Sequence, residues 1–153
     1  MAAICLALTG CSAFTPPPMF DPGHYSYTYK PYDLTFYWNI KVEKNTYYIS
    51  GLVKNTYMYP LYGLEMTVTL LDAQRREVGE GTHFFIPPQI KLDDSELFYL
   101  TMNLKDGTKP VTIKFLYNYR IPESDGYGNS PYYYSFEKDL DTTHPSGNGK
   151  SYR

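Results

Sequence analysis

Hydrophobic and polar residues alternate one by one along much of the chain between residues 32 and 136. In the stretch LTFYWNIKV, one side of an extended backbone carries Leu34, Phe36, Trp38, Ile40 and Val42. Successive side chains of a β-strand point to opposite faces of the sheet, so this pattern predicts a half-buried antiparallel strand. The same pattern predicts further strands over residues 46–55, 64–71, 77–86, 96–104, 111–119 and 132–140.

Turn-forming residues separate these segments, as in EKN, DAQRRE and KDGTKP, and no helical periodicity of useful length is present. Short strands at regular spacing without helices predict an all-β fold, an immunoglobulin-like antiparallel β-sandwich. A small closed barrel is the alternative, because alternation does not distinguish two packed sheets from one closed sheet. Gly79 and Gly81 indicate a bulge in their strand or the close approach of another backbone.

The flanks of the predicted sandwich differ from it in composition. Residues 11–31 contain five prolines with little apolar periodicity, and this predicts a tether of polyproline character. Within it Tyr25, Tyr27 and Tyr29 alternate, which indicates an extra edge strand as an alternative. Residues 137–153 are polar and predict a disordered tail, so the sandwich domain is expected over 32–136.

Residues 1–10 form a short apolar run that ends in small residues, as in a secretory signal peptide, and they are too few to span a membrane. Leu8-Thr9-Gly10-Cys11 resembles the lipobox of bacterial lipoproteins. The resemblance implies cleavage before Cys11, acylation of that cysteine and anchorage by its lipid chains. Ser12 in place of aspartate favours the outer membrane.

The signal contains no Lys or Arg before its apolar run, so either the start codon lies upstream or the sequence is trimmed. The alternative is that Cys5 and Cys11 are buried thiols of an ordinary N-terminal segment. The stretch TPPP that follows argues against a packed helix there. If the signal is removed and Cys11 is acylated, no pair of cysteines remains to form a disulfide.

Residues 46–104 resemble a family of bacterial envelope domains named for a Phe-x-Leu-Tyr-Asp strand. The matching residues are Gly51, Val53, Asn55, Leu70, Asp72 and Phe98, whereas Val68 and Leu71 stand where the family has Phe and Tyr. The resemblance implies an immunoglobulin-like sandwich in secreted or membrane-tethered bacterial proteins, usually without assigned catalysis.

Candidate chemistry is sparse. The net charge of −2 and the absence of a basic run exclude a nucleic-acid surface. The histidines, His24, His83 and His144, have no ligand at metal-site spacing, so no metal and no cofactor are predicted. The carboxylates of residues 93–96 fit a solvated turn better than a calcium loop. No nucleophile motif is present, so no catalytic residue is predicted and an enzyme is the least favoured class.

The 18 tyrosines are the remaining feature. The candidate binding residues are Tyr57, Tyr59, Tyr62, Tyr132, Tyr133 and Tyr134, because rings with a hydroxyl suit protein interfaces and sugar faces. We expect a lipid-anchored, non-enzymatic envelope protein that binds or scaffolds another envelope component. Carbohydrate binding through the tyrosine-rich loops is the alternative. A third interpretation is that these rings only cover a small disulfide-free core.

Overall fold

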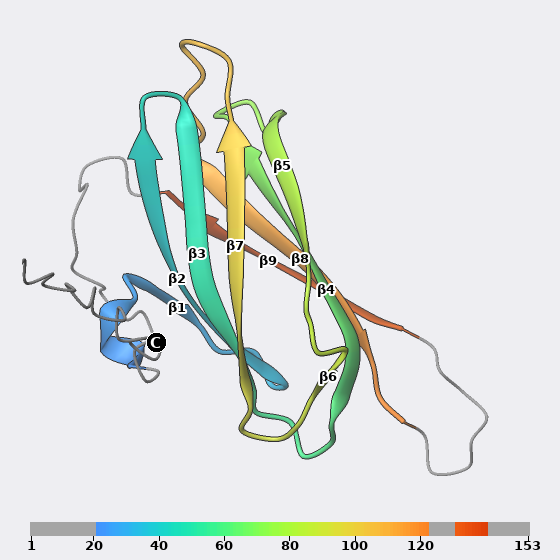
Figure 1. Cartoon of the computed structure of the whole chain (residues 1–153). Helices are drawn as coiled ribbons and strands as arrows, with labels where there is room; N and C mark the ends of the chain where they lie inside the picture. The colour runs from blue at the N-terminus through green and yellow to red at the C-terminus, as the bar shows by residue number, and fades with distance from the viewer. Residues whose placement is uncertain (1–20, 123–130, 141–153) are drawn as a thin grey trace, which may run out of the picture.

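The computed structural model describes residues 21–122 and 131–140. Figure 1 shows that this part of the chain consists almost entirely of strands after one short 3₁₀ turn, Pro22–His24. The strands are β1 (Tyr27–Tyr29), β2 (Leu34–Glu43), β3 (Thr46–Asn55), β4 (Leu61–Leu71), β5 (Glu77–Phe84), β6 (Gln89–Ile90), β7 (Ser95–Asn103), β8 (Thr112–Arg120) and β9 (Tyr132–Asp139).

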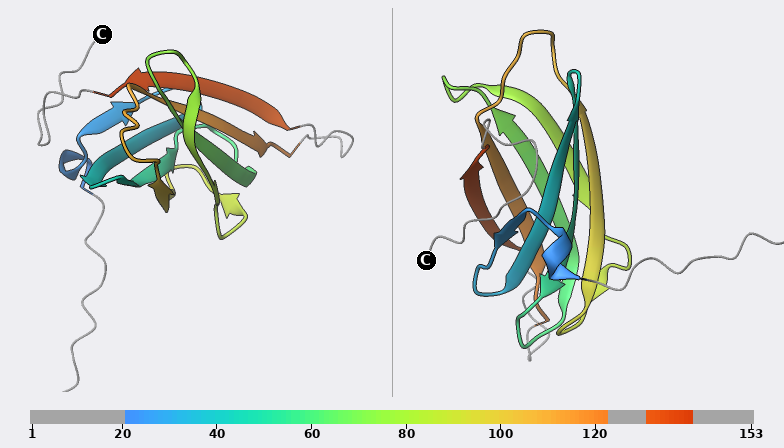
Figure 2. Two further views of the ribbon diagram at one scale, coloured as in Figure 1. Left: turned by 90° about the horizontal axis from the view of Figure 1, so that it is seen from above. Right: turned by 90° about the vertical axis from the view of Figure 1, so that its left-hand side faces the viewer.

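The strands form two antiparallel sheets that pack face to face (Figure 2). One sheet has the order β1-β2-β3-β7, and the other has the order β5-β4-β8-β9 with β6 paired to β4. The fold is therefore an immunoglobulin-like antiparallel β-sandwich, as the alternation predicts. The barrel alternative does not hold, because the strands pair within two separate sheets.

The core fills the space between the sheets with alternate residues of each long strand. Phe36 and Trp38 of β2 are fully buried, as predicted, but Val42 is exposed because β2 extends past the core at that end. The centre is aromatic, with Phe115 stacked on Phe136 at 4.7 Å and Trp38 packed on Phe115 at 4.9 Å between ring centroids. The contact of Trp38 with Phe115 crosses between the sheets, whereas Phe115 and Phe136 are neighbours on β8 and β9 of one sheet. Aromatic packing therefore joins the two sheets at the centre of the core.

Glycines in two strands permit close packing. A Cβ on Gly51 would lie 2.3 Å from the carbonyl oxygen of Tyr37 and 2.4 Å from the Phe98 ring, so no larger residue fits there. A Cβ on Gly79 would lie 2.6 Å from the Leu104 side chain. Side chains of the facing sheet, and not another backbone, therefore occupy the space beside Gly79. The predicted irregularity of this strand is present where the β4–β5 register shifts between Leu70 and Leu71.

The ordered sandwich extends beyond the predicted limits of 32 and 136. Strand β1 pairs with β2, so the extra edge strand exists within the range expected to be a tether. Its Tyr29 stacks on Phe136 at 4.0 Å and so joins the two sheets along this side. At the other boundary, β9 continues to Asp139. The lipobox, the rest of the tether and residues 141–153 lie outside the described residues.

No helix among the described residues is long and apolar enough to cross a membrane.

Candidate functional site

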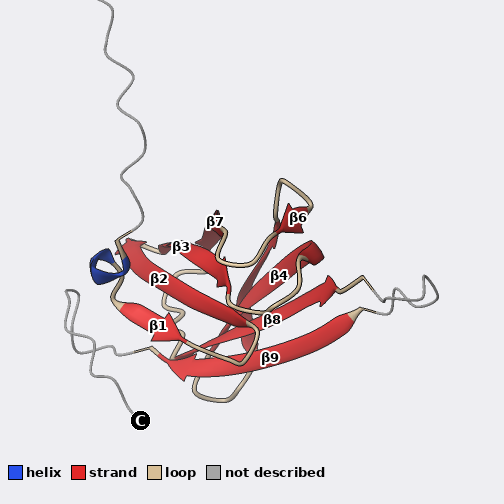
Figure 3. Cartoon of the chain, turned by 90° about the horizontal axis from the view of Figure 1, so that it is seen from below, coloured by secondary structure: helices blue, strands red, loops and turns tan. Residues whose placement is uncertain are grey.

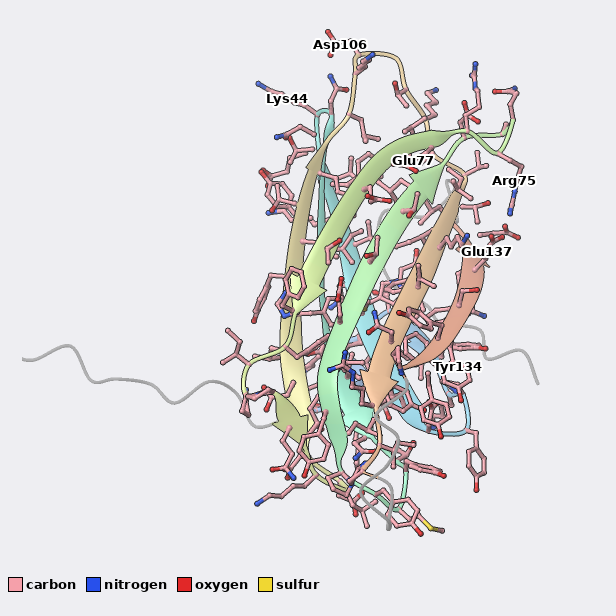
Figure 4. All side chains as sticks on the ribbon, turned by 90° about the vertical axis from the view of Figure 1, so that its right-hand side faces the viewer. Lys44, Arg75, Glu77, Asp106, Tyr134 and Glu137 are labelled. Atoms are coloured by element: carbon pink, nitrogen blue, oxygen red, sulfur yellow. The ribbon has the colours of Figure 1, made fainter. Side chains whose placement is uncertain are left out.

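Tyrosines from three separate segments meet at one end of the sandwich. Tyr32 comes from the turn before β2, Tyr57 and Tyr59 come from the β3–β4 connection, and Tyr132 and Tyr134 begin β9. We call these five residues the tyrosine cluster. Figure 4 places Tyr134 toward the opposite end of the molecule from Lys44 and Asp106.

Tyr57 is the centre of the tyrosine cluster. Its ring meets Tyr32 edge-on at 5.8 Å and 64°, and it meets Tyr59 at 5.7 Å and 61°. Desolvation raises the pKa of Tyr57, and the neighbouring hydroxyls of Tyr32, Tyr59, Tyr132 and Tyr134 raise it further. Tyr57 is therefore protonated and neutral at physiological pH, with a hydroxyl that can both donate and accept a hydrogen bond.

A fully buried asparagine fixes the loop that carries Tyr57 and Tyr59. Asn55 Nδ2 donates to the carbonyl oxygens of Tyr59 and Ile90, both at 3.0 Å, and Asn55 Oδ1 accepts the backbone N–H of Tyr57 at 2.8 Å. The Asn55 side chain is 0% exposed. Because each of these groups would be costly to leave unpaired in the interior, the loop is held in one conformation.

A buried carboxylate directly before β2 supports the cluster by linking to two tyrosines of the facing sheet. Asp33 is 5% exposed, and its Oδ1 accepts the backbone N–H of Leu34 at 3.0 Å and the hydroxyl of Tyr117 at 3.4 Å. Its Oδ2 accepts the hydroxyl of Tyr119. Burial raises the pKa of both tyrosines well above the ordinary range, and the hydrogen bonds to Asp33 raise it further. Both phenols therefore remain donors across the physiological range.

Near-parallel stacking connects the buried rings of Tyr117 and Tyr119 to exposed rings of β9. Tyr119 stacks with Tyr132 at 5.9 Å and 24° and with Tyr134 at 5.9 Å and 19°. Tyr117 stacks with Tyr134 at 5.5 Å and 26°. The exposed rings of β9 thus rest on two buried rings of β8, which limits their rotation.

The structure separates two of the six predicted binding tyrosines from the others. Tyr62 lies opposite Arg120 on the outward face of its sheet, where its hydroxyl accepts a hydrogen bond from Gln89 at 2.8 Å. Tyr133 also lies on the outward face, opposite Asn118, and is 64% exposed. Neighbouring residues of a strand point in opposite directions, so Tyr132, Tyr133 and Tyr134 do not form one surface.

Sequence reasoning missed three residues of this end. Tyr32 is 84% exposed and contacts Tyr57, whereas Asp33 and Asn55 are the buried polar groups that support the cluster. The available signals were Asp33, a polar residue directly before a buried strand, and Asn55, a polar residue at the end of another. Each is ambiguous alone, because such residues also begin and end ordinary turns.

The other polar candidates have structural roles. Asp93 forms an ion pair with Lys54 at 2.8 Å, and no metal-ligand group of three or more residues occurs in the described ranges. Asp72 accepts the backbone N–H groups of Gln74 and Arg76, both at 2.9 Å, and so closes the turn after β4.

His83 lies opposite the buried Met66 and faces the core at the β5 edge. Its ring meets Phe85 edge-on at 4.7 Å. Burial lowers the pKa of His83, and hydrogen bonds to the backbone at Leu97 and Tyr99 oppose that shift.

No family model matches the chain, and no curated protein matches it. Among solved structures, the GAE domain of yeast GGA1 is similar over 75% of this chain and 98% of that chain, with 9% identity and a TM-score of 0.48. The GAE domain of GGA2p from Saccharomyces cerevisiae covers 74% and 96%, with 13% identity and a TM-score of 0.43. A protein from Archaeoglobus fulgidus covers 75% and 98%, with 14% identity and a TM-score of 0.34. Likenesses at this level say nothing of function.

Proposed function

We propose that this protein is a lipid-anchored, non-enzymatic component of the bacterial cell envelope whose sandwich binds another envelope protein through the tyrosine cluster. One observation carries the binding role. Five tyrosines from three distant segments converge on one end, where the buried side chains of Asn55 and Asp33 hold their loops from beneath.

The chemistry of the tyrosine cluster suits a protein partner. Tyrosine presents a large apolar ring and a hydroxyl while losing little side-chain entropy, and it is enriched in interfaces and their energetic centres. A loop already fixed in the free protein loses less freedom on binding, which favours affinity. No charged residue belongs to the cluster, so desolvation on binding costs little.

The binding surface is tested by removing its most exposed rings. Tyr57 packs against the core, so its replacement would also perturb folding. Tyr32→Ala/Tyr59→Ala is the sharper variant, because these rings are 84% and 48% exposed. Tyr48→Ala/Tyr99→Ala is the matched control, since both of its rings are exposed on β3 and β7 and neither belongs to the tyrosine cluster.

We expect Tyr32→Ala/Tyr59→Ala to keep the melting temperature within a few degrees and to lose pull-down of envelope proteins. The control should keep both properties. Equal pull-down by the two variants would show that the partner does not contact the tyrosine cluster.

Carbohydrate binding is the second candidate, and the stacked rings favour it. Tyr132 and Tyr134 present near-parallel faces over Tyr119, and flat aromatic faces suit the apolar face of a sugar ring. Retention on peptidoglycan or polysaccharide columns separates the two candidates. Retention that is lost in Tyr132→Ala/Tyr134→Ala, without any protein captured, would favour a glycan.

The lipid anchor rests on Leu8-Thr9-Gly10-Cys11. Expressed with a complete signal, the protein should incorporate labelled palmitate and partition into detergent, and Cys11→Ala should lose both properties. Labelling that persists in this variant would contradict the anchor while leaving the test of the tyrosine cluster unaffected.

A further inference from the structure

Strand β9 is an open edge of the sandwich. It pairs with β8 on one side and, among the described strands, with no other on its free side (Figure 3). Of its eight side chains, only Phe136 is buried. Strand β1, the edge of the facing sheet, is three residues long and contacts β9 through Tyr29 on Phe136. Little of β9 is therefore covered.

An unpaired edge presents backbone donors and acceptors to another strand. In an antiparallel ladder, alternate residues direct their N–H and C=O groups away from the neighbouring strand, so about half of the β9 residues offer both groups outward. Proteins usually protect such edges by shortening, bending or charging them along their length. Strand β1 fits that description, with three residues, but β9 has eight.

The charges of β9 all lie in one half of the strand. Its first half, residues 132–135, consists of three tyrosines and a serine. Its second half ends in Glu137, Lys138 and Asp139. Because its charges are confined to one half, β9 is complementary to an antiparallel copy of itself. Antiparallel pairing sets the charged half of each strand against the uncharged half of the other.

We propose that β9 pairs antiparallel with β9 of a second copy of this chain, about a two-fold axis at Ser135. In that register Tyr134 faces Phe136 of the second copy, which gives two aromatic pairs on the inward face. Tyr133 faces Glu137, and Tyr132 faces Lys138, so no like charges oppose one another. Cross-strand aromatic pairs stabilise a sheet, whereas opposed like charges destabilise it.

The charge pattern limits the register. An axis at Glu137 would set that carboxylate against its own copy, and an axis at Lys138 would do the same with the two ammonium groups. The axis at Ser135 avoids both and pairs residues 132–138 of each strand. The resulting interface is isologous and closed, so it yields a dimer and not a fibre.

Cysteine cross-linking tests the register directly, in the 153-residue chain produced without export and carrying Cys5→Ser and Cys11→Ser. Ser135→Cys should give a disulfide-linked dimer under mild oxidation, because opposed Cα atoms in an antiparallel pair lie within disulfide range. Leu116→Cys is the matched control. Leu116 is exposed and lies beside Ser135 on β8, one strand away from the edge. A dimer from both variants or from neither would overturn the proposal.

Sedimentation of the reduced wild-type chain gives an independent test, and a monomer–dimer equilibrium is expected. Tyr133→Glu should raise the dissociation constant about tenfold, since symmetry opposes the new carboxylate to Glu137 twice. Tyr99→Glu, which is 64% exposed like Tyr133 but lies on β7, should leave it unchanged. A monomer at every concentration would overturn the proposal and leave the edge to a strand of another protein.

The proposed pairing of β9 does not rest on the proposed function, although two members of the tyrosine cluster, Tyr132 and Tyr134, lie in the paired strand. Tyr32 and Tyr59 lie outside β9, so Tyr32→Ala/Tyr59→Ala should dimerise like the wild-type chain. Loss of partner binding with dimerisation intact, or the reverse, therefore separates the failure of one proposal from the failure of the other.

Discussion

At the end of the sandwich near Lys44 and Asp106 (Figure 4), exposed charged and polar side chains close the turns, with Asp72 at 8% exposure the exception. The opposite end is held by the buried polar groups Asn55 and Asp33. At the first end, Arg75 forms a two-point ion pair with Glu137 at 2.7 and 2.8 Å, and Asn45 donates to Asp106. We call this the charged end, and the other the tyrosine end.

The two ends differ in what it costs to break one of their hydrogen bonds. Water replaces a broken surface contact at the charged end, and exposed ion pairs are screened, so each contributes little to stability. At the tyrosine end, Asn55 and Asp33 are buried, and water does not reach the partners that a substitution would leave. The conformation of the tyrosine end is therefore the more strongly determined of the two, and such pre-organisation would favour the proposed binding.

The largest expected effect is at Asn55. Asn55→Ala leaves two carbonyl oxygens and one N–H without their partner and should lower the free energy of unfolding by about 3 kcal/mol. The control at the charged end, Asn45→Ala, should cost about 0.5 kcal/mol or less. Urea denaturation of the two variants measures both values. Similar costs at both positions would remove the distinction between the ends.

An intermediate effect is expected from alkaline pH at the tyrosine end. The folded-state pKa of Tyr119 is raised, so above about pH 10 the unfolded chain ionises this phenol first and folding stability falls as pH rises. Tyr119→Phe should cost about 2 kcal/mol at neutral pH, because it leaves an oxygen of the buried Asp33 carboxylate without its donor.

The same variant should lose stability less steeply than wild type above pH 10, because it no longer has that phenol to ionise. Melting temperatures recorded across the alkaline range compare the two slopes. Parallel curves would mean that the buried phenol does not contribute to the alkaline transition.

The smallest expected effect concerns the backbone at the charged end. Lys44 occupies the left-handed region with φ of 54°, which glycine adopts more easily than other residues. Lys44→Gly should raise the free energy of unfolding by about 0.5 kcal/mol. Gly107→Ala, at φ of 78° in the neighbouring loop, should lower it by about 1 kcal/mol. Chemical denaturation measures both, and a destabilised Lys44→Gly would show that the lysine side chain contributes more than its backbone costs.

The alternation predicted the long strands well, but it missed β6 and left β1 as an alternative. The alternation in β2 and β4 identified the buried residues Phe36, Trp38, Met66 and Val68, because a strand with one buried face must repeat every two residues. Strand β6 was missed, since two residues are too few to show a period. Pairing of β1 was left as an alternative, because whether an isolated extended segment forms a strand depends on the edge available to it.

The sequence predicted part of the tyrosine cluster, and a binding role for it stays a prediction. Tyr57, Tyr59, Tyr132 and Tyr134 belong to it, but Tyr62 does not, because β4 begins at Leu61 and the alternation there directs Tyr62 outward. The predicted strand began three residues later, which left Tyr62 in a loop with no assigned face. Tyr133 was grouped with its neighbours although the period of two within β9 separates them.

The sequence by itself determined the class of fold and the abundance of tyrosine at the surface. The alternation, the turn residues and the tyrosine content are local properties, so each segment has them wherever it lies in the fold. Only the tertiary structure decided that Tyr32, Tyr57 and Tyr134 meet, and that Asp33 accepts from Tyr117 and Tyr119, more than 80 positions away. Those contacts depend on strand order and register, which are set by the packing of whole sheets and not by any one segment.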